Sequence, residues 1–358
     1  MADHSDGLWE RVGVESRWYV SFHGGEGRHD RNNLHAYGLN GEPLGTVLAT
    51  HVLPTAVALR ELRGFSWGPD GDLYVADAYK GDSRILRFGG QPGADGKHTF
   101  VAVFAEQGGE GKPAAGHHHQ ASEAGGPPPH PGLAHPFDVA FGPDGNLYVP
   151  AQDTQIVARC YGPLTVRGPL ACGLPGGPMP HPSALSDLGL PPGILHVGTF
   201  VPAHHHVPAP VGLREVRHAL FGPGGDLFVA DRAAGRVKRY HGTTGALLAE
   251  LGGDHLPTPI HLLFLPDGRL LAGSRDAHAV FALDLEGGAV SPLVKPGAGG
   301  LREPGGLALG PDGLLYVASR GGRQVLRFDP ETGMSAGKPF LNDLPDAPEF
   351  VRLVADAA

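Results

Sequence analysis

One short phrase returns five times along the chain and limits its possible folds more than any other feature. A Pro-Asp-Gly or Pro-Gly-Gly turn stands between two apolar runs, with its proline at Pro69, Pro143, Pro223, Pro266 and Pro311. In such a turn proline fixes φ, aspartate caps its own backbone and glycine takes a positive φ. Each copy therefore predicts a β-hairpin.

The spacing of these turns predicts a ring of repeats. The intervals between the five prolines are 74, 80, 43 and 45 residues, and the two long intervals carry roughly 30 residues beyond an ordinary unit. A period in the low forties with several strands per unit is typical of a β-propeller blade of about four strands. We expect the extra residues to form loop insertions at about 106–135 and 162–215.

The two ends of the chain supply the parts of one more blade. Residues 18–22, 34–39 and 44–49 predict second, third and fourth strands, and residues 348–354 predict a first strand with nothing after it. Joined, they form a blade closed by both termini, which removes the open edge that a propeller otherwise exposes. The sequence thus predicts an all-β fold, a single six-bladed propeller domain over residues 1–358 with four-stranded blades.

Charge and composition limit the partners and the compartment. The formal net charge is −9 and no basic run occurs, so we expect neither nucleic acid nor a membrane as a partner. No apolar segment approaches the length of a membrane span and the first residues are polar, which predicts a cytoplasmic protein. A closed propeller can be stable alone, so we expect a monomer. Cys160 and Cys172 then stay free thiols, whereas in an exported protein they would form a disulfide.

Candidate site residues follow from aligning the blades on their turns. Five residues before each turn proline, at the start of each inner strand, stand Gly64, Asp138, His218, His261 and Gly306, with Phe350 or Glu349 from the closing strand. These positions are expected to converge at one mouth of the central channel. Imidazoles and a carboxylate suit a divalent metal, Zn²⁺ or alternatively Ca²⁺, and three protein ligands leave a position for water or substrate. We therefore expect a metal on Asp138, His218 and His261; the alternative is a histidine pair hydrogen-bonded around ordered water.

Four more residues are candidates for the chemistry. Asp77 and Asp231 end second strands at the same mouth, where Asp231 is placed to orient His218 or to act as a general base. Arg63 and Arg217 each stand one residue before a ring position and are placed to hold an anion or stabilise an oxyanion. The other interpretation of the two aspartates is structural, because a carboxylate after a strand commonly caps the following loop.

Runs of histidine occur in both insertions. His117-His118-His119 belongs to the first insertion, and His204-His205-His206 returns to the channel mouth shortly before His218. Such runs are compositional signals of metal binding. On a Pro-rich loop they are more often solvated, so we expect these segments to form a lid that shields the mouth, with a donated ligand as the alternative.

The repeated pattern resembles a known family. The inner strand, the Pro-Asp-Gly turn, Leu-Tyr-Val-Ala-Asp and Arg-Val-x-Arg-Phe resemble NHL repeats over nearly all of the chain outside the insertions. In site layout the chain looks most like peptidyl-hydroxyglycine amidating lyases, which hold zinc with histidines at inner-strand starts. The resemblance implies zinc on His218 and His261, although Arg217 and Ile260 stand where that family has proline. Gluconolactonase-like propellers match less well, because asparagine is absent from every ring position.

Three functions stay open, because such propellers include enzymes and binding modules alike. The leading hypothesis is a metal-dependent lyase or hydrolase acting on a small molecule or modified peptide at the channel mouth. A metal-free cyclase or isomerase would use Asp138, Asp231 and Arg217 at the same mouth. A non-enzymatic NHL-type binding or scaffold propeller would show an exposed binding face and no buried polar cluster.

Overall fold

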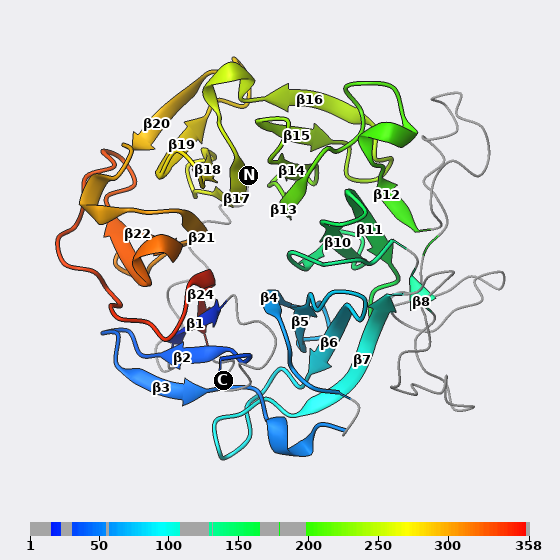
Figure 1. Cartoon of the computed structure of the whole chain (residues 1–358), viewed down its shortest axis with the longest axis vertical. Helices are drawn as coiled ribbons and strands as arrows, with labels where there is room; N and C mark the ends of the chain where they lie inside the picture. Colours follow the sequence, from blue (N-terminus) through cyan, green and yellow to red (C-terminus); the bar gives the residue numbers. More distant parts are fainter. Residues whose placement is uncertain are drawn as a thin grey trace, which may run out of the picture.

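Six sheets radiate from a central axis (Figure 1), which confirms the all-β six-bladed propeller. The computed structural model describes residues 16–22, 31–54, 57–107, 129–130, 132–164, 179 and 198–355. Helical structure among them is limited to single 3₁₀ turns, none of which is long and apolar enough to span a bilayer.

The first three blades in chain order are built as follows. Blade 1 contains β4 (Leu62–Trp67), β5 (Leu73–Asp77), β6 (Arg84–Phe88) and β7 (Phe100–Gln107), with β8 (Pro129–His130) parallel to β7. Blade 2 contains β9 (Ala140–Phe141), β10 (Leu147–Ala151), β11 (Ile156–Cys160) and β12 (Thr199–Val201). Blade 3 contains β13 (Val216–Phe221), β14 (Leu227–Asp231), β15 (Arg236–Tyr240) and β16 (Leu247–Leu251).

The remaining blades repeat the pattern with one irregularity. Blade 4 contains β17 (Pro259–Phe264), β18 (Leu270–Ser274), β19 (Ala279–Leu283) and β20 (Val290–Val294). Blade 5 contains β21 (Pro304–Leu309), β22 (Leu315–Ser319) and β23 (Gln324–Phe328). In the fourth position of blade 5 two isolated bridges, Val325 to Leu341 and Phe328 to Ser335, replace a regular strand. Gly333 and Gly337 at positive φ interrupt an extended conformation there.

Both ends of the chain close blade 6, as the sequence predicts. It contains β24 (Pro348–Ala355), β1 (Ser16–Phe22), β2 (His35–Tyr37) and β3 (Pro43–Thr46), in that order. β24 and β1 pair antiparallel along their whole length. Glu349 of β24 is buried between two arginines of other blades, 2.8 Å from Arg63 and 2.7 Å from Arg320. The closing strand is therefore tied to blades 1 and 5 by charge as well as by packing.

The turn phrase explains why each blade begins with a hairpin. The glycine of every turn has a positive φ, between 74° and 91°. In three of the turns a tyrosine of the second strand donates its hydroxyl to the turn aspartate, as Tyr74 does to Asp70 at 3.0 Å. The strands β5, β10, β14, β18 and β22 that follow the turns are buried throughout, because neighbouring blades pack against both faces.

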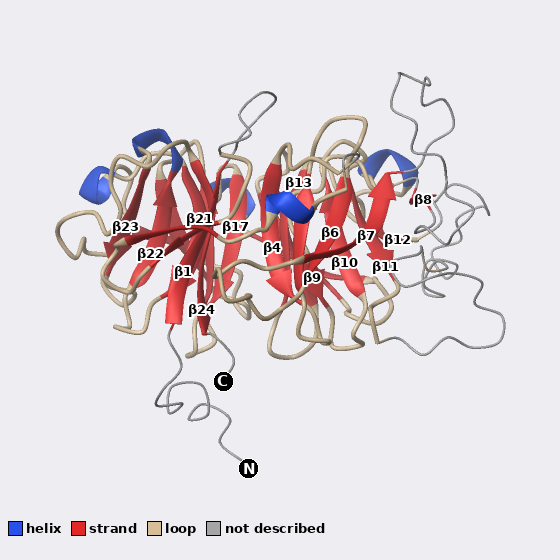
Figure 2. Cartoon of the chain, turned by 90° about the horizontal axis from the view of Figure 1, so that it is seen from below, coloured by secondary structure: helices blue, strands red, loops and turns tan. Residues whose placement is uncertain are grey.

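Two faces of the disc follow from the strand directions. We call the face with the Pro-Asp-Gly turns the turn face. The opposite face, where each outer strand leads to the next inner strand, is the loop face. The 3₁₀ helices lie toward the loop face (Figure 2): η1 (Thr50–Val52), η3 (His204–His206), η4 (Gly253–His255), η5 (Ala298–Gly300) and η6 (Arg320–Gly322).

Candidate functional site

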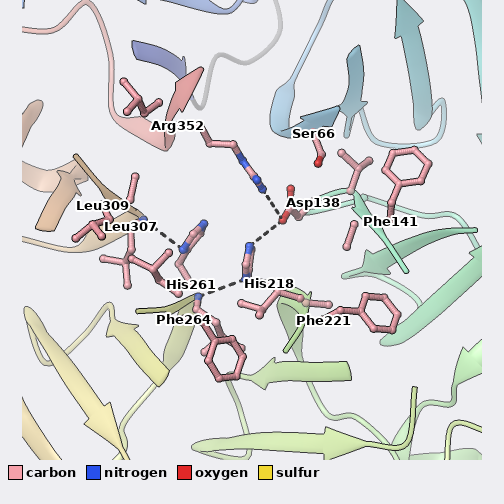
Figure 3. Close-up of a pocket in the computed structure, with 18 residues that line it drawn as sticks. Ser66, Asp138, Phe141, His218, Phe221, His261, Phe264, Leu307, Leu309 and Arg352 are labelled. Atoms are coloured by element: carbon pink, nitrogen blue, oxygen red, sulfur yellow. Dashed lines mark hydrogen bonds and ion pairs between the residues drawn. The ribbon is translucent and has the colours of Figure 1, made fainter. Parts of the chain in front are cut away.

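Three inner strands bring the predicted ring residues together. Asp138 stands just before β9, His218 in β13 and His261 in β17, and all three line one cavity of about 410 Å³ on the channel axis (Figure 3). Blade alignment therefore identified three residues that meet in space although they lie far apart in the chain.

The cavity opens on the opposite side of this ring from the one that the sequence suggested. Its lining residues stand at the ring positions or later in each inner strand, so it extends toward the turn face. On the loop side of the cavity, at ring level, lies Phe350 of blade 6. Its ring lies 5.4, 6.1 and 5.1 Å from those of Phe137, His218 and His261, which belong to blades 2, 3 and 4. Phe350 therefore reaches across the axis, and the described cavity lies on the turn-face side of the ring, whereas the sequence suggested a mouth on the loop face.

A second layer of side chains surrounds the cavity two residues after the ring. Residues two apart on a strand face the same side, and this layer consists of Ser66, Ala140, Leu220, Leu263, Ala308 and Arg352. Phe141, Phe221 and Phe264 at the next position border the cavity too, but their rings turn away from it and pack on Tyr74, Tyr148 and Phe228 of the neighbouring blades (Figure 3). The cavity is thus polar at the ring, and the layer after the ring is apolar apart from Arg352 and Ser66.

Asp138 is the unusual member of the site. Its side chain is 1% exposed, and His218 Nε2 and Arg352 Nη2 lie 2.9 and 3.5 Å from its Oδ2 atom. Neither contact has the angles of a hydrogen bond, so both carboxylate oxygens lack a hydrogen-bond partner among the described residues. A buried acceptor without a donor lowers the free energy of unfolding, because its lost hydration is not replaced. A carboxylate held in this state is ready to accept a proton or a donor from a ligand.

A glycine of the neighbouring blade makes room for this carboxylate. A Cβ atom on Gly64 would lie 1.9 Å from Asp138 Oδ1 and 2.6 Å from Asp138 Cα. Any side chain at position 64 would displace the acid, so the small residue in the ring is a requirement of the site.

The two histidines face the cavity with the same nitrogen. The backbone N–H of Leu262 donates to His218 Nδ1 at 3.3 Å, and that of Leu307 donates to His261 Nδ1 at 3.2 Å. An acceptor Nδ1 means that a neutral ring carries its proton on Nε2. Burial, followed by the charges of His218 and Arg352, lowers the pKa of His261 well below its ordinary value. His261 is therefore a neutral donor at physiological pH.

These hydrogen bonds do not fit the expected metal. A metal-bound histidine donates from its other ring nitrogen to a carbonyl or carboxylate, whereas here that nitrogen accepts a hydrogen bond from a backbone N–H. Within the described parts of the chain, no group of three or more His, Cys, Asp or Glu is arranged to hold a metal ion. The residues present therefore do not fit a metal ion at this site.

The two predicted arginines lie on the loop side and do not line the cavity. Arg63 forms ion pairs with Glu61 and Glu349. Arg217 forms an ion pair with Glu215, and burial lowers its pKa to about 10. Neither arginine is among the residues that line the cavity with Asp138.

Asp77 and Asp231, the other predicted catalytic residues, occupy structural positions away from the cavity. Asp77 accepts the Glu61 backbone N–H and pairs with buried Arg84 at 2.8 Å. Asp231 accepts the backbone N–H groups of residues 214 and 215 and lies 3.2 Å from Lys238 Nζ. Both carboxylates cap the loop before their own blade's inner strand, which matches the structural alternative for these residues.

The described residues among the remaining candidates do not line the cavity. His204, His205 and His206 form η3 on the loop face, and none of them is buried. His117, His118, His119 and Cys172 lie outside the described residues. Cys160 is buried in β11, and burial raises the pKa of its thiol to about 12, so it is not poised as a nucleophile.

Sequence reasoning missed Arg352. This residue lies two positions after Phe350, the ring residue of β24, so the same period-two alignment extended by one step would have found it.

Comparisons with known proteins support the fold. No protein-family model and no curated protein matches the chain. A solved structure titled "Streptogramin B lyase structure" aligns with a TM-score of 0.55 and 11% identity over 96% of this chain and 92% of that chain. A chain of the "Crystal structure of Nidogen/Laminin Complex" aligns with a TM-score of 0.56 and 13% identity over 96% and 100%. At such low identity these likenesses show the propeller alone; the NHL and amidating-lyase resemblances remain predictions.

Proposed function

We propose that the protein is a lyase or isomerase that removes a proton beside the carbonyl group of a small molecule, with Asp138 as the base. The observation that carries this proposal is the Asp138 carboxylate, which is buried at the cavity wall without a hydrogen-bond donor. The same cavity is lined by His218 and His261, whose Nδ1 atoms accept backbone N–H groups, and by Arg352. An acceptor facing several donors suits a reaction that creates an oxyanion while a proton leaves carbon.

The reaction needs three events at named groups. Asp138 takes a proton from the carbon next to the carbonyl, the C–H electron pair forms a C=C bond, and the carbonyl π pair moves onto oxygen. The enolate oxygen accepts a hydrogen bond from His261 Nε2–H. When the oxygen pair re-forms the carbonyl, the C=C pair can form a new C=C bond to the next carbon while a group leaves that carbon with its bonding pair, which is a lyase reaction. Where the enolate is conjugated with a second C=C bond, the far carbon can instead take the proton back from Asp138, which is an isomerase reaction.

His218 serves this chemistry as a positioning residue. Its Nδ1 is fixed by the Leu262 N–H, and its Nε2 faces Asp138 Oδ2 at 2.9 Å. An imidazole ring fixed at Nδ1 limits the rotation of the carboxylate beside it. The stacked His261 then presents its own Nε2–H to the cavity.

The comparisons are consistent with a lyase but do not distinguish it from a binding protein. One similar structure is named a lyase and the other belongs to a nidogen/laminin complex. A fold of this kind hosts both classes. The buried polar cluster favours an enzyme, because a surface used only for recognition gains nothing from an unsatisfied carboxylate below it.

Hydrogen–deuterium exchange at carbon tests the proposal without a known product. A panel of small ketones, aldehydes and 2-oxo acids is incubated in D₂O with the protein, and deuterium incorporation is followed by NMR. Asp138→Asn should lower the rate about 10²- to 10⁴-fold, the usual contribution of a general base. Asp153→Asn, a partly exposed carboxylate outside the cavity lining, is the control. Equal rates of exchange with wild type and with Asp138→Asn would contradict the proposal.

A further inference from the structure

Resting on the proposed function, we infer that the substrate is a small carboxylic acid with an apolar tail, and that Arg352 binds its carboxylate. The inference comes from the distribution of charge and apolar surface in the cavity. It names the class of molecule that the site accepts, which the assignment of Asp138 as a base leaves open.

Arg352 is the cation of the cavity and is held in place without being neutralised. It is the one Lys or Arg among the described residues that line the cavity. Its guanidinium lies over Phe65, 5.8 Å from the ring centroid, which fixes its direction. Its Nη2 atom is 3.5 Å from Asp138 Oδ2, longer than the roughly 2.7–2.9 Å of a charge-assisted hydrogen bond. With its side chain 34% exposed, the guanidinium is free to pair with a carboxylate in the cavity.

The apolar walls indicate the rest of the molecule. The layer of the lining that contains Arg352 is otherwise mostly apolar, with Ala140, Leu220, Leu263 and Ala308. A polar ring next to an apolar layer around one cation favours an amphiphilic ligand whose charged group pairs with Arg352. A cavity of about 410 Å³ accepts a small molecule and is too small for a folded or polymeric partner.

The carboxylate of Asp138 next to Arg352 distinguishes an acidic ligand from a neutral or cationic one. Asp138 contacts the same guanidinium and carries the same sign of charge as the proposed ligand, so it opposes carboxylate binding. Neutralising Asp138 should therefore strengthen binding of an acid while it abolishes proton abstraction. A cationic or neutral ligand would respond in the opposite way or not at all.

Calorimetric titration with two matched probes tests this inference. The probes are 4-phenylbutyrate and 4-phenylbutanamide, which differ in charge and share the apolar tail. The proteins are wild type, Arg352→Gln, Asp138→Asn and a control, Arg323→Gln, which removes an exposed arginine outside the cavity. Thermal unfolding of each variant shows that it is folded before titration.

We expect wild type and Arg323→Gln to bind the acid at least tenfold more tightly than the amide. Arg352→Gln should remove that preference, and Asp138→Asn should bind the acid several-fold more tightly than wild type. Equal affinity of wild type for both probes, no binding of either, or a preference that survives Arg352→Gln would overturn the inference. Loss of deuterium exchange in Asp138→Asn is a separate result, so the base and the carboxylate site fail or succeed independently.

Discussion

The imidazole ring of His218 stacks on that of His261, with ring centroids 3.9 Å apart and planes inclined by 30°. Two imidazolium ions at this distance would repel each other strongly in a buried site. The neighbouring positive charge of Arg352 adds to this effect and to the burial that lowers the pKa of His261. His261 therefore acts as a neutral hydrogen-bonding group, and this property limits which chemistry the cavity supports.

The lowered pKa of His261 predicts a loss of stability in acid. Unfolded histidine has a pKa of about 6.5; in the folded protein the value is well below this. The unfolded state therefore binds a proton first as pH falls, so the stability is fully present above about pH 6.5 and is lost below it. The slope from this one group approaches about 1.4 kcal/mol per pH unit.

Urea unfolding between pH 8 and pH 5 measures this slope. His261→Gln should flatten the dependence relative to wild type, whereas His204→Gln, on the exposed η3 turn, should leave it unchanged. An identical pH dependence in wild type and His261→Gln would show that His261 is protonated in the folded state.

Gly64→Ala should disable the site from a neighbouring blade. The new methyl group would overlap Asp138 Oδ1 and approach its Cα, so the carboxylate must move. We expect at least a tenfold loss of deuterium exchange and a destabilisation of about 1–3 kcal/mol, as for other overpacked positions. Gly224→Ala is the control, because nothing lies within 4 Å of its added Cβ atom. Full activity of Gly64→Ala would contradict the position given to Asp138.

Asp77→Ala should affect stability and leave the chemistry alone. Removing this carboxylate leaves Arg84 buried without its partner at 2.8 Å, a change that typically costs about 3–5 kcal/mol. Asp82→Ala breaks the more exposed pair with Arg60 and should cost about 1 kcal/mol or less. Urea unfolding gives both values. The rate of deuterium exchange per folded molecule should equal that of wild type. A hundredfold loss would indicate that Asp77 is a catalytic residue after all.

Removal of divalent metal should leave the activity intact. Both Nδ1 atoms accept hydrogen bonds from backbone N–H groups. In a neutral ring the Nε2 atom then carries the hydrogen and has no lone pair for a metal. Protein purified without an affinity tag, treated with EDTA and dialysed should keep its rate of deuterium exchange. Loss of exchange that returns with one equivalent of Zn²⁺ would favour the metal-dependent alternative instead.

Local chemistry made the fold predictable. The Pro-Asp-Gly turns and the apolar runs beside them specify hairpins within a few residues, and their recurrence specifies the ring. The convergence of Asp138, His218 and His261 followed from the same alignment, because strand geometry repeats from blade to blade.

The open side of the cavity could not be predicted in this way. It depends on Phe350 crossing the axis and on Arg63 pairing with Glu349, residues 286 positions apart. The capping partners of Asp77 and Asp231 are backbone N–H groups, which have no sequence signature. These errors came from long-range packing and from main-chain contacts, whereas Arg352 was accessible to the alignment and was overlooked.

His218 and His261 line the same cavity as Asp138, each with its Nδ1 accepting a backbone N–H, and the tautomeric state of their rings is directly measurable. Long-range ¹H–¹⁵N NMR spectra of uniformly ¹⁵N-labelled protein at pH 7.5 report which ring nitrogen carries the proton. His218→Gln and His261→Gln variants assign the two signals. We predict the neutral Nε2–H tautomer for both residues. An Nδ1–H tautomer at either one, with Nε2 left free for a metal, would contradict the account.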